Sequence, residues 1–487
     1  MNYIKFFEMV PEAILVAILI ITFIADFASH GKSERNWFNP LVSAMLFAGT
    51  VATLCFAEKE AFLFGGAYIS TAANTMMKAI LGAGTVIVVL QSKKWLSGVE
   101  TRKIEGEFYM LTISTLLGMY MMMSAGSFLM FFLGLETASV PLACMVALDK
   151  QRRDSAEAAA KFILTATFSS GVMLYGISLL YGAVGTLYFE DFTAVLTATP
   201  MTICGLVFFV AGLGFKISLV PFHFWTADTY QGAPTTVTGY LSVISKGAAS
   251  FTLAVLLMRV FAPMVEYWET LMYILIVLSI TIGNLMAIRQ TELKRFMAFS
   301  SISQAGYIML AIIGANYAAS LSALMYYVLV YIVANMCVFA IISVVEQNNN
   351  GKTEIADYNG FYGTNPKLAF LMTLALFSLG GIPPFAGMFS KFFVFLASVN
   401  GEGNNWMPYL IMFIALVNTV VSLYYYLLIV KAMYVNKSDN PLPTFKSDCY
   451  TRLTLFICVA GILLFGIFSC IYEAIFATVA EDMKNKQ

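Results

Sequence analysis

Residues 215–225 read FKISLVPFHFW, which places a lysine, a proline and a histidine inside an otherwise apolar stretch. Between residues 192 and 227 the chain carries no Asp, Glu, Lys, Arg or His apart from Lys216 and His223. Proline lacks a backbone donor and clashes with the preceding helical turn, so Pro221 predicts a helix that breaks midway along the stretch. The sequence therefore predicts a discontinuous helix with a lysine beside its break.

The rest of the chain is equally apolar. Of its 487 residues 60% are hydrophobic and 11% charged, with a mean hydropathy of +0.80, whereas soluble domains carry about 25% charged residues. The formal net charge is zero, which argues against nucleic acid as a partner. Apolar runs long enough to cross a bilayer recur from end to end. We expect an all-α polytopic membrane protein, with no basic leader typical of a cleaved signal peptide.

The apolar runs predict about fourteen transmembrane helices. Their expected spans are 9–28, 38–57, 74–91, 107–124, 127–148, 158–182, 201–224, 235–260, 268–288, 297–315, 317–345, 366–396, 406–434 and 453–478.

A second break is expected at GGIPPF, residues 380–385, five helices after the first. A unit of five spans repeated in tandem must insert upside down the second time, as in many transporters with discontinuous helices at the transport site. We therefore expect four domains. These are an N-terminal three-helix segment (1–106), a five-helix repeat (107–262), a second, inverted five-helix repeat (263–435) and a C-terminal helix with its tail (436–487).

Loop charges predict the orientation. Most lysines and arginines of the loops fall on one side of these spans, among them Lys93, Lys150, Lys294, Lys367 and Arg452. The other side receives Lys5, Lys59, Arg259, Lys484 and Lys486. Short basic loops stay in the cytoplasm, so both termini are expected on the periplasmic or outer side of a bacterial inner membrane.

Four charged residues are expected deep inside spans: Glu136, Lys216, Lys246 and Lys391. An ion at that depth costs at least about 2.5–3.5 kcal/mol on insertion scales. Burial disfavours the charged form of each group, and a nearby opposite charge favours it. A lysine held between these effects can gain or lose a proton when a neighbouring charge moves. We therefore predict a proton relay, supplied with water by the broken helices.

Structural alternatives stand beside this hypothesis. Glu136 and Lys216 could form an ion pair that only fixes helix register. Lys246 and Lys391 could extend to a membrane interface. Lys161 follows Glu157 by four residues, so a surface helix pair is an alternative to a functional role. His223 could equally be a satisfied core histidine or a proton carrier.

No redox cofactor or metal is expected in this chain. Its seven cysteines contain no C-x-x-C pair, and its only histidines are His30 and His223. The cysteine spacing and the two histidines predict neither a metal or haem site nor a disulfide framework.

Four segments resemble a known family. They are FLGLETASVPLACMVAL (132–148), residues 157–187, GLGFKISLVPFHFWTADTYQGAPTTVTGYLSVISKGAA (212–249) and GGIPPFAGMFSKFFVF (380–395). In this order they resemble the antiporter-like membrane subunits of proton-pumping NADH:quinone oxidoreductase, respiratory complex I, most closely its subunit N. The resemblance covers most of the chain and implies fourteen helices with two inverted five-helix repeats.

The resemblance also implies roles. Glu136 matches the glutamate that pairs with the broken-helix lysine, here Lys216. Lys246 matches the central proton carrier, and Lys391 the terminal lysine of the second half-channel. Lys161 matches a lysine that modulates the Glu136–Lys216 pair. Flavin, iron–sulfur clusters and quinone are implied only in partner subunits, which include neighbouring antiporter-like subunits.

Two positions depart from the family pattern. Ala227 replaces the proline of the usual WTPD, which is expected to loosen the loop after the first break. Gln304 stands where a histidine is common. Glutamine carries no proton as a charge, so a relay there would need water bound to Gln304 or Ser303.

The sequence thus predicts a proton-translocating subunit of NADH:quinone oxidoreductase, coupled electrostatically to redox chemistry elsewhere. The same core motifs occur in Mrp-type cation/proton antiporters and membrane-bound hydrogenase modules, which form the alternative. A third possibility is an assembly scaffold whose ion pairs are purely structural.

Overall fold

A computed structural model of the chain describes residues 8–29, 35–56, 60–98, 101–314, 316–349, 351, 353–399, 406–438, 441–468 and 470–484. Five lysines of the predicted charge asymmetry, and one of the two histidines, lie outside these residues: Lys5, Lys32, Lys59, Lys352, Lys486 and His30. The fold consists almost entirely of helices, with one short hairpin of strands β1 (Ala61–Leu63) and β2 (Tyr68–Ser70).

The chain divides into two compact units. The first contains Met1–Ile217, Ile244–Leu271 and Ile475–Gln487, and the second contains Ser218–Val243 and Met272–Ala474. The division falls at the predicted first break, because the chain leaves the first unit directly after Ile217. The predicted domain boundaries at residues 107, 263 and 436 remain a prediction.

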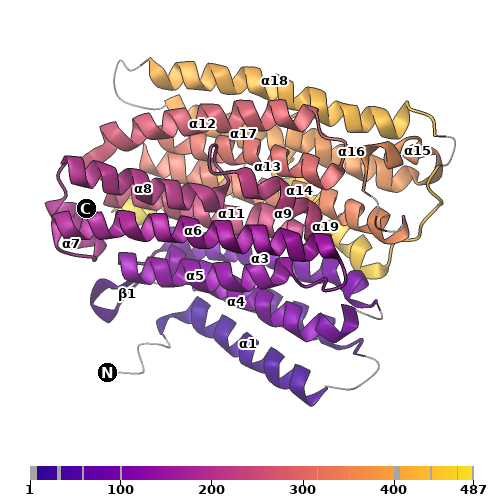
Figure 1. Ribbon diagram of the computed structural model, residues 1–487, viewed down its shortest axis with the longest axis horizontal. Coiled ribbons are helices and arrows are strands. Elements are labelled where there is room, and N and C mark those ends of the chain that lie inside the picture. Colours follow the sequence, from indigo (N-terminus) through magenta and orange to yellow (C-terminus); the bar gives the residue numbers. More distant parts are fainter. Residues whose placement is uncertain are drawn as a thin grey trace. The chain divides into compact units, whose positions relative to one another are not determined.

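The first unit is built from α1 (Val10–Ala28), α2 (Phe38–Cys55), α3 (Ala72–Leu96), α4 (Glu105–Met123), α5 (Phe128–Val146), α6 (Arg153–Val184), α7 (Phe189–Val195), α8 (Pro200–Ile217) and α11 (Lys246–Val255). Within it α4 packs on α5, and α6 runs beside α8 (Figure 1). Helix α11 packs against α8, α4 and α3, which brings the helix of Lys246 close to that of Lys216.

The second unit is built from α9 (Phe224–Gly232), α10 (Thr235–Tyr240), α13 (Leu293–Leu310), α14 (Tyr317–Asn348), α15 (Phe361–Thr364), α16 (Pro366–Gly380), α17 (Ala386–Val399), α18 (Met407–Tyr434) and α19 (Cys449–Ile467). Helix α14 is its centre and packs on α16, α17 and α19. Helices α12 (Val265–Ile288) and α20 (Cys470–Lys484) contribute residues to both units.

The polytopic membrane class is confirmed. Among the described residues, 12 helices are long and apolar enough to cross a membrane. The two remaining predicted spans, 107–124 and 366–396, coincide with α4 and with the pair α16 and α17. The count of fourteen spans and the inverted relation of the repeats remain predictions.

Both predicted helix breaks are present. Helix α8 ends at Ile217, Ser218 follows with φ 66°, and α9 begins only at Phe224. Helix α16 ends at Gly380, Gly381 follows with φ 85°, and α17 begins after the two prolines. A residue with left-handed backbone conformation is a common helix stop. Each half-helix therefore ends at a residue of left-handed conformation.

The expected loop around Ala227 is helical, so that prediction was wrong. Ala227 is buried inside α9, and the next residue, Asp228, pairs with Arg295 of α13 at 2.6 Å. Alanine is the strongest helix former and supplies the backbone donor that proline lacks. Ala227 is therefore compatible with the helix that follows the break.

The predicted span 235–260 is an interrupted helix. It consists of α10, a π-helical turn at Leu241–Ser245, α11 and a second π-helical turn at Leu256–Val260. π-turns inside α-helices are rare and occur often at functional sites. Lys246 is the first residue after the first π-turn, so it too lies at a helix discontinuity.

Close packing of α4 on α5 depends on two glycines. A Cβ atom on Gly118 would lie 2.3 Å from the backbone nitrogen of Ala138, and one on Gly134 would lie 2.5 Å from that of Met122. Small residues let helix backbones approach closely in membranes, where apolar burial adds little. This contact fixes the face of α5 that carries Glu136.

We expect Gly134→Ala to destabilise the protein by about 1–3 kcal/mol, the usual cost of overpacking, because the new methyl meets rigid backbone. Gly171→Ala in α6 is the matched control, since a Cβ there has no neighbour within 4 Å. The readout is the thermal midpoint of the purified protein. Equal midpoints for the two variants would contradict this account of the α4–α5 contact.

Candidate functional site

Lys216 is buried in the last turn of α8, with 8% of its surface exposed. Its Nζ donates a hydrogen bond to Oγ of Ser139 on α5 at 2.6 Å and lies 5.8 Å from the ring centre of Phe162. The carbonyl end of a helix carries a partial negative charge that favours a cation. The break after Ile217 thus places this end of α8 beside the lysine.

Glu136 lies on the same face of α5, three residues before Ser139. It is half-buried and accepts a hydrogen bond from Oγ of Ser170 on α6 at 2.6 Å. It is also close enough to Lys216 to interact with it electrostatically. Helices α5, α6 and α8 therefore carry the carboxylate and the lysine that the sequence paired, but each bonds to a serine and, among the described residues, no salt bridge joins the two.

A cavity of about 20 Å³ connects Lys216 with the helix of Lys246. Lys216 and Ser139 line one part of it, and Ser245 and Ala249, from the turn that contains Lys246, line another. One water molecule needs about 10–15 Å³ and polar partners, and this cavity offers both. Lys246 itself is 1% exposed. The space permits a water bridge that begins at Lys216 and leads toward α11.

Lys391 belongs to the second unit and lies at the second break. Its Nζ donates to the carbonyl oxygen of Gly380, the last residue of α16, at 3.1 Å and lies 5.1 Å from the ring centre of Tyr307. A Cβ on Gly381 would lie 3.1 Å from Cδ of Lys391, so the glycine leaves room for the lysine stem. Like Lys216, Lys391 uses the carbonyl end of a half-helix.

Gln304 lies next to Lys391. Both line a cavity of about 10 Å³ together with Tyr327, Tyr331 and Ser390, a volume at the lower limit for one water. The Gln304 side chain accepts from the Tyr327 hydroxyl and donates to the Tyr426 hydroxyl at 3.2 Å. It therefore joins two tyrosines in a polar chain beside the cavity that Lys391 lines, and the expected relay through water bound to Gln304 or Ser303 remains a prediction.

Lys161 and His223 were the two further candidates from the sequence. The Lys161 ammonium pairs with Glu157 at 2.7 Å, and the two side chains are 46% and 66% exposed. His223 is half-buried at the start of α9 and stacks on Phe224 with ring centres 4.7 Å apart. The surface-pair alternative for Lys161 thus describes its geometry, and a modulating role for either residue remains a prediction.

A buried ion pair in the first three helices was missed from the sequence. The Lys78 ammonium on α3 contacts Glu12 of α1 at 2.5 Å, and the two side chains are only 0% and 5% exposed. The Tyr68 hydroxyl donates to the same carboxylate at 2.8 Å. Lys78 is the only charged residue between Glu60 and Lys93, the same signal that singled out Lys246.

The second buried ion pair contains a lysine that the sequence assigned to a basic loop. Lys294, which the sequence placed in a basic loop, is 1% exposed at the start of α13. It donates to the carbonyl oxygen of Ala233 at 2.9 Å and lies 3.6 Å from Glu346. The charge pattern gave no hint of this burial, because both residues lie at helix ends.

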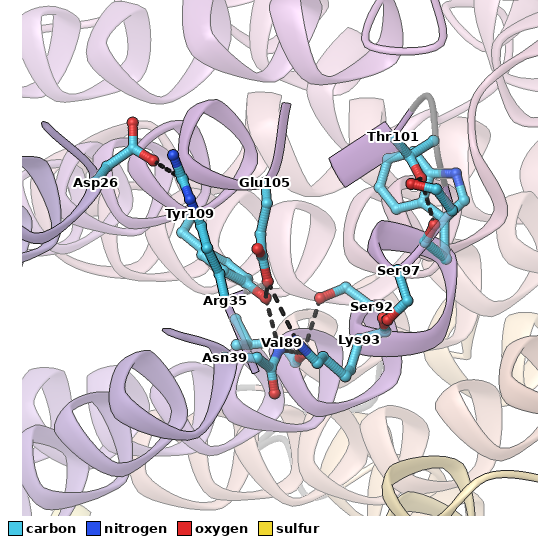
Figure 2. A network of polar contacts seen from close by, with 12 residues as sticks. Asp26, Arg35, Asn39, Val89, Ser92, Lys93, Ser97, Thr101, Glu105 and Tyr109 are labelled. Atoms are coloured by element: carbon cyan, nitrogen blue, oxygen red, sulfur yellow. Dashed lines mark hydrogen bonds and ion pairs between the residues drawn. The ribbon is translucent and has the colours of Figure 1, made fainter. Parts of the chain in front are cut away.

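A polar network also links the ends of the first four helices (Figure 2). Arg35 pairs with Asp26 at 2.5 Å, and Lys93 lies 3.5 Å from Glu105. The Tyr109 hydroxyl donates to Glu105 at 3.3 Å. Its members come from α1, α3, α4 and the turn before α2, so the network holds these helix ends together.

Known proteins share this fold and much of this sequence. A family model described as "NADH:quinone oxidoreductase/Mrp antiporter, TM" matches residues 125–422. NADH-quinone oxidoreductase subunit N of Phocaeicola vulgatus is 57% identical over 466 residues, which cover 96% of this chain and 97% of that one. Respiratory complex I from Thermus thermophilus contains a chain with a TM-score of 0.79 and 28% identity, covering 96% of this chain and 99% of that chain.

A chain of the Mrp complex from Dietzia sp. has a TM-score of 0.82 over 98% of this chain and 97% of its own length. At 17% identity this match shows a shared fold alone. The fold and the buried lysines thus define an antiporter-like membrane subunit. Within that class, the chain belongs to the family of NADH-quinone oxidoreductase subunit N.

We expect Ser139→Ala to reduce the number of protons pumped per NADH oxidised, because Lys216 loses a hydrogen bond. Such a bond to a charged group contributes about 1.5–3 kcal/mol. Ser139→Thr, which keeps a hydroxyl, should retain more pumping. Thr137→Val is the control on the same helix, since that hydroxyl donates only to the carbonyl of Leu133. Identical pumping in Ser139→Ala and Thr137→Val vesicles would contradict the assignment.

We expect Lys78→Met to destabilise the complex by about 3–5 kcal/mol, because it leaves the Glu12 carboxylate buried without its ammonium partner. The double variant Glu12→Gln/Lys78→Met should recover most of the loss. The thermal midpoint of the purified complex measures both effects. A double variant no more stable than Lys78→Met would show that the pair is not the source of the loss.

Proposed function

We propose that this chain translocates protons across the membrane as a membrane-arm subunit of NADH:quinone oxidoreductase. Glu136, Lys216, Lys246 and Lys391 are the proposed proton-transfer residues. Its similarity to subunit N of Phocaeicola vulgatus supports the choice of enzyme. In this scheme the chain performs no redox chemistry of its own.

One observation carries the proposal: each of the three lysines lies at a discontinuity of its helix. Lys216 is one residue before the end of α8, and Lys246 directly follows a π-turn. Lys391 bonds to the last carbonyl of α16. A structural ion pair needs no broken helix. A lysine that changes its charge does need adaptable polar neighbours and water, and free backbone groups at helix breaks provide them.

The proposed cycle begins at Glu136 and Lys216. A charge shift in a neighbouring subunit draws the carboxylate away from Lys216, whose ammonium is then stabilised only by Ser139 and the end of α8. The lysine releases its proton to the water-sized cavity on the side of α11, and Lys246 takes it up. Transfer onward to Lys391 completes the path. The coupling is electrostatic and acts between subunits in the same membrane.

Partners and location follow from this proposal. The neighbours are other membrane-arm subunits of the complex, including further antiporter-like subunits. Flavin, iron–sulfur clusters and quinone belong to those partners. The chain lies in the bacterial inner membrane, with both termini on the periplasmic side. In this proposal Lys161 and His223 modulate the field at Lys216.

The test uses the intact complex in inverted membrane vesicles. We expect Glu136→Ala or Lys216→Met to abolish this subunit's share of NADH-driven proton uptake, because removing a positioned acid–base group slows proton transfer by about a hundredfold or more. Glu107→Gln and Lys150→Met are matched controls, since that pair is 52% and 70% exposed at 3.7 Å. Near-normal pumping in Glu136→Ala vesicles would refute the scheme.

A second measurement distinguishes the proposed function from that of an Mrp-type antiporter, which the same family model describes. Vesicles without an electron donor are given a sodium gradient, and proton movement is followed. The proposed function predicts no sodium-dependent exchange attributable to this chain. Exchange that disappears in Lys216→Met would favour an Mrp-type antiporter. Full pumping after all four charges are neutralised would instead favour a scaffold.

A further inference from the structure

A groove of about 760 Å³ lies in the second unit, where α16 and α19 both begin. The two helices pack together, and the segment from Thr444 to Ser447 closes the groove on one side. None of the residues in the proposed proton path lines it. It is therefore a separate feature of the fold.

The closing segment is held firmly by Asn365, the residue before α16. The buried Asn365 amide donates to the carbonyl oxygen of Pro443 at 3.0 Å, and its Oδ1 accepts from the backbone N–H of Phe445 at 3.0 Å. The hydroxyl of Thr444 donates to the carbonyl of Thr364 at 3.2 Å. These bonds give the groove a defined wall.

Three cationic side chains line the mouth: Lys367, Lys446 and Arg452. Arg452 uses its Nε to donate to the carbonyl of Ser447 at 2.8 Å, which orients its guanidinium. Within the part of the chain that the structure describes, no carboxylate pairs with any of the three. The nearby Asp448 instead accepts from the first N–H groups of α19 at 3.2 and 3.3 Å.

Below this basic mouth the wall is apolar. Leu371 lies one turn into α16, and Leu455, Phe456 and Val459 continue along α19. From Arg452 to Val459 the helix rises by about 10 Å, the distance from a headgroup to the upper part of an acyl chain. Phe456 is 72% exposed, so the wall is open to an apolar neighbour.

We propose that this groove binds an anionic phospholipid. Its phosphodiester is held by Lys367, Lys446 and Arg452, and an acyl chain runs along Leu371, Phe456 and Val459. A soluble anion would leave the apolar wall unused, whereas a lipid complements the basic mouth and the wall together. Basic pockets between transmembrane helices are known receptors for anionic headgroups. The proposal does not depend on proton translocation by this chain.

The test compares Lys367→Gln/Lys446→Gln with the control Lys431→Gln/Lys437→Gln in the complete complex. The control removes two exposed lysines of α18 and the segment after it, outside the groove. Lipids retained after mild detergent purification are quantified by mass spectrometry. We expect the groove variant alone to lose about one phosphatidylglycerol or cardiolipin per complex. Equal retention in both variants, or equal loss of phosphatidylethanolamine, would overturn the proposal.

A titration gives the size of the effect. Delipidated complex is placed in phosphatidylcholine vesicles with increasing phosphatidylglycerol, and the thermal midpoint is recorded. Because each lysine contributes about fivefold to anionic-lipid binding, we expect half-saturation to require about thirtyfold more phosphatidylglycerol in the variant that lacks two of them. If the groove variant loses a neighbouring subunit while its lipids are unchanged, the groove is a protein interface and the proposal is wrong.

Discussion

A charged lysine among apolar helices needs polar partners, and an unbroken helix offers almost none, because its backbone groups are already bonded to one another. Each buried lysine of the proposed path lies beside a helix end or a π-turn. Lys391 donates a hydrogen bond to the last carbonyl of α16. Lys216 lies in the last turn of α8 and donates a hydrogen bond to the Ser139 hydroxyl. Helix breaks are therefore one way in which this membrane protein tolerates internal charge, and a buried partner of opposite charge, as in Lys78 with Glu12, is another.

Helix packing also positions the charged side chains. Close contact at Gly118 and Gly134 presses α4 against α5 and fixes the face that carries Glu136 and Ser139. The cavity beside Lys216, of about 20 Å³, is about large enough for one water. Elsewhere, Glu12 with Lys78 and Glu346 with Lys294 are buried pairs that join helices in fixed positions.

Much of this could be predicted from local sequence, because both hydrophobic span length and proline chemistry act over short distances. Pro221 and the run 380–385 predicted both breaks, and isolated lysines in apolar runs predicted the burial of Lys216, Lys246 and Lys391. Lys78 carried the same signal and was overlooked. The prediction of a loop at Ala227 was wrong, because alanine has the highest helix propensity and the position is helical.

The sequence by itself determined the membrane class, the helix breaks and the burial of the lysines, since each depends on residues within a few turns. Tertiary structure alone decided which side chains meet. Ser139 contacts Lys216 across 77 positions and Glu12 contacts Lys78 across 66. Lys294 bonds to the Ala233 carbonyl between α9 and α10 and lies 3.6 Å from Glu346 of α14. These contacts depend on helix rotation and packing distance, which arise only when several helices pack at once.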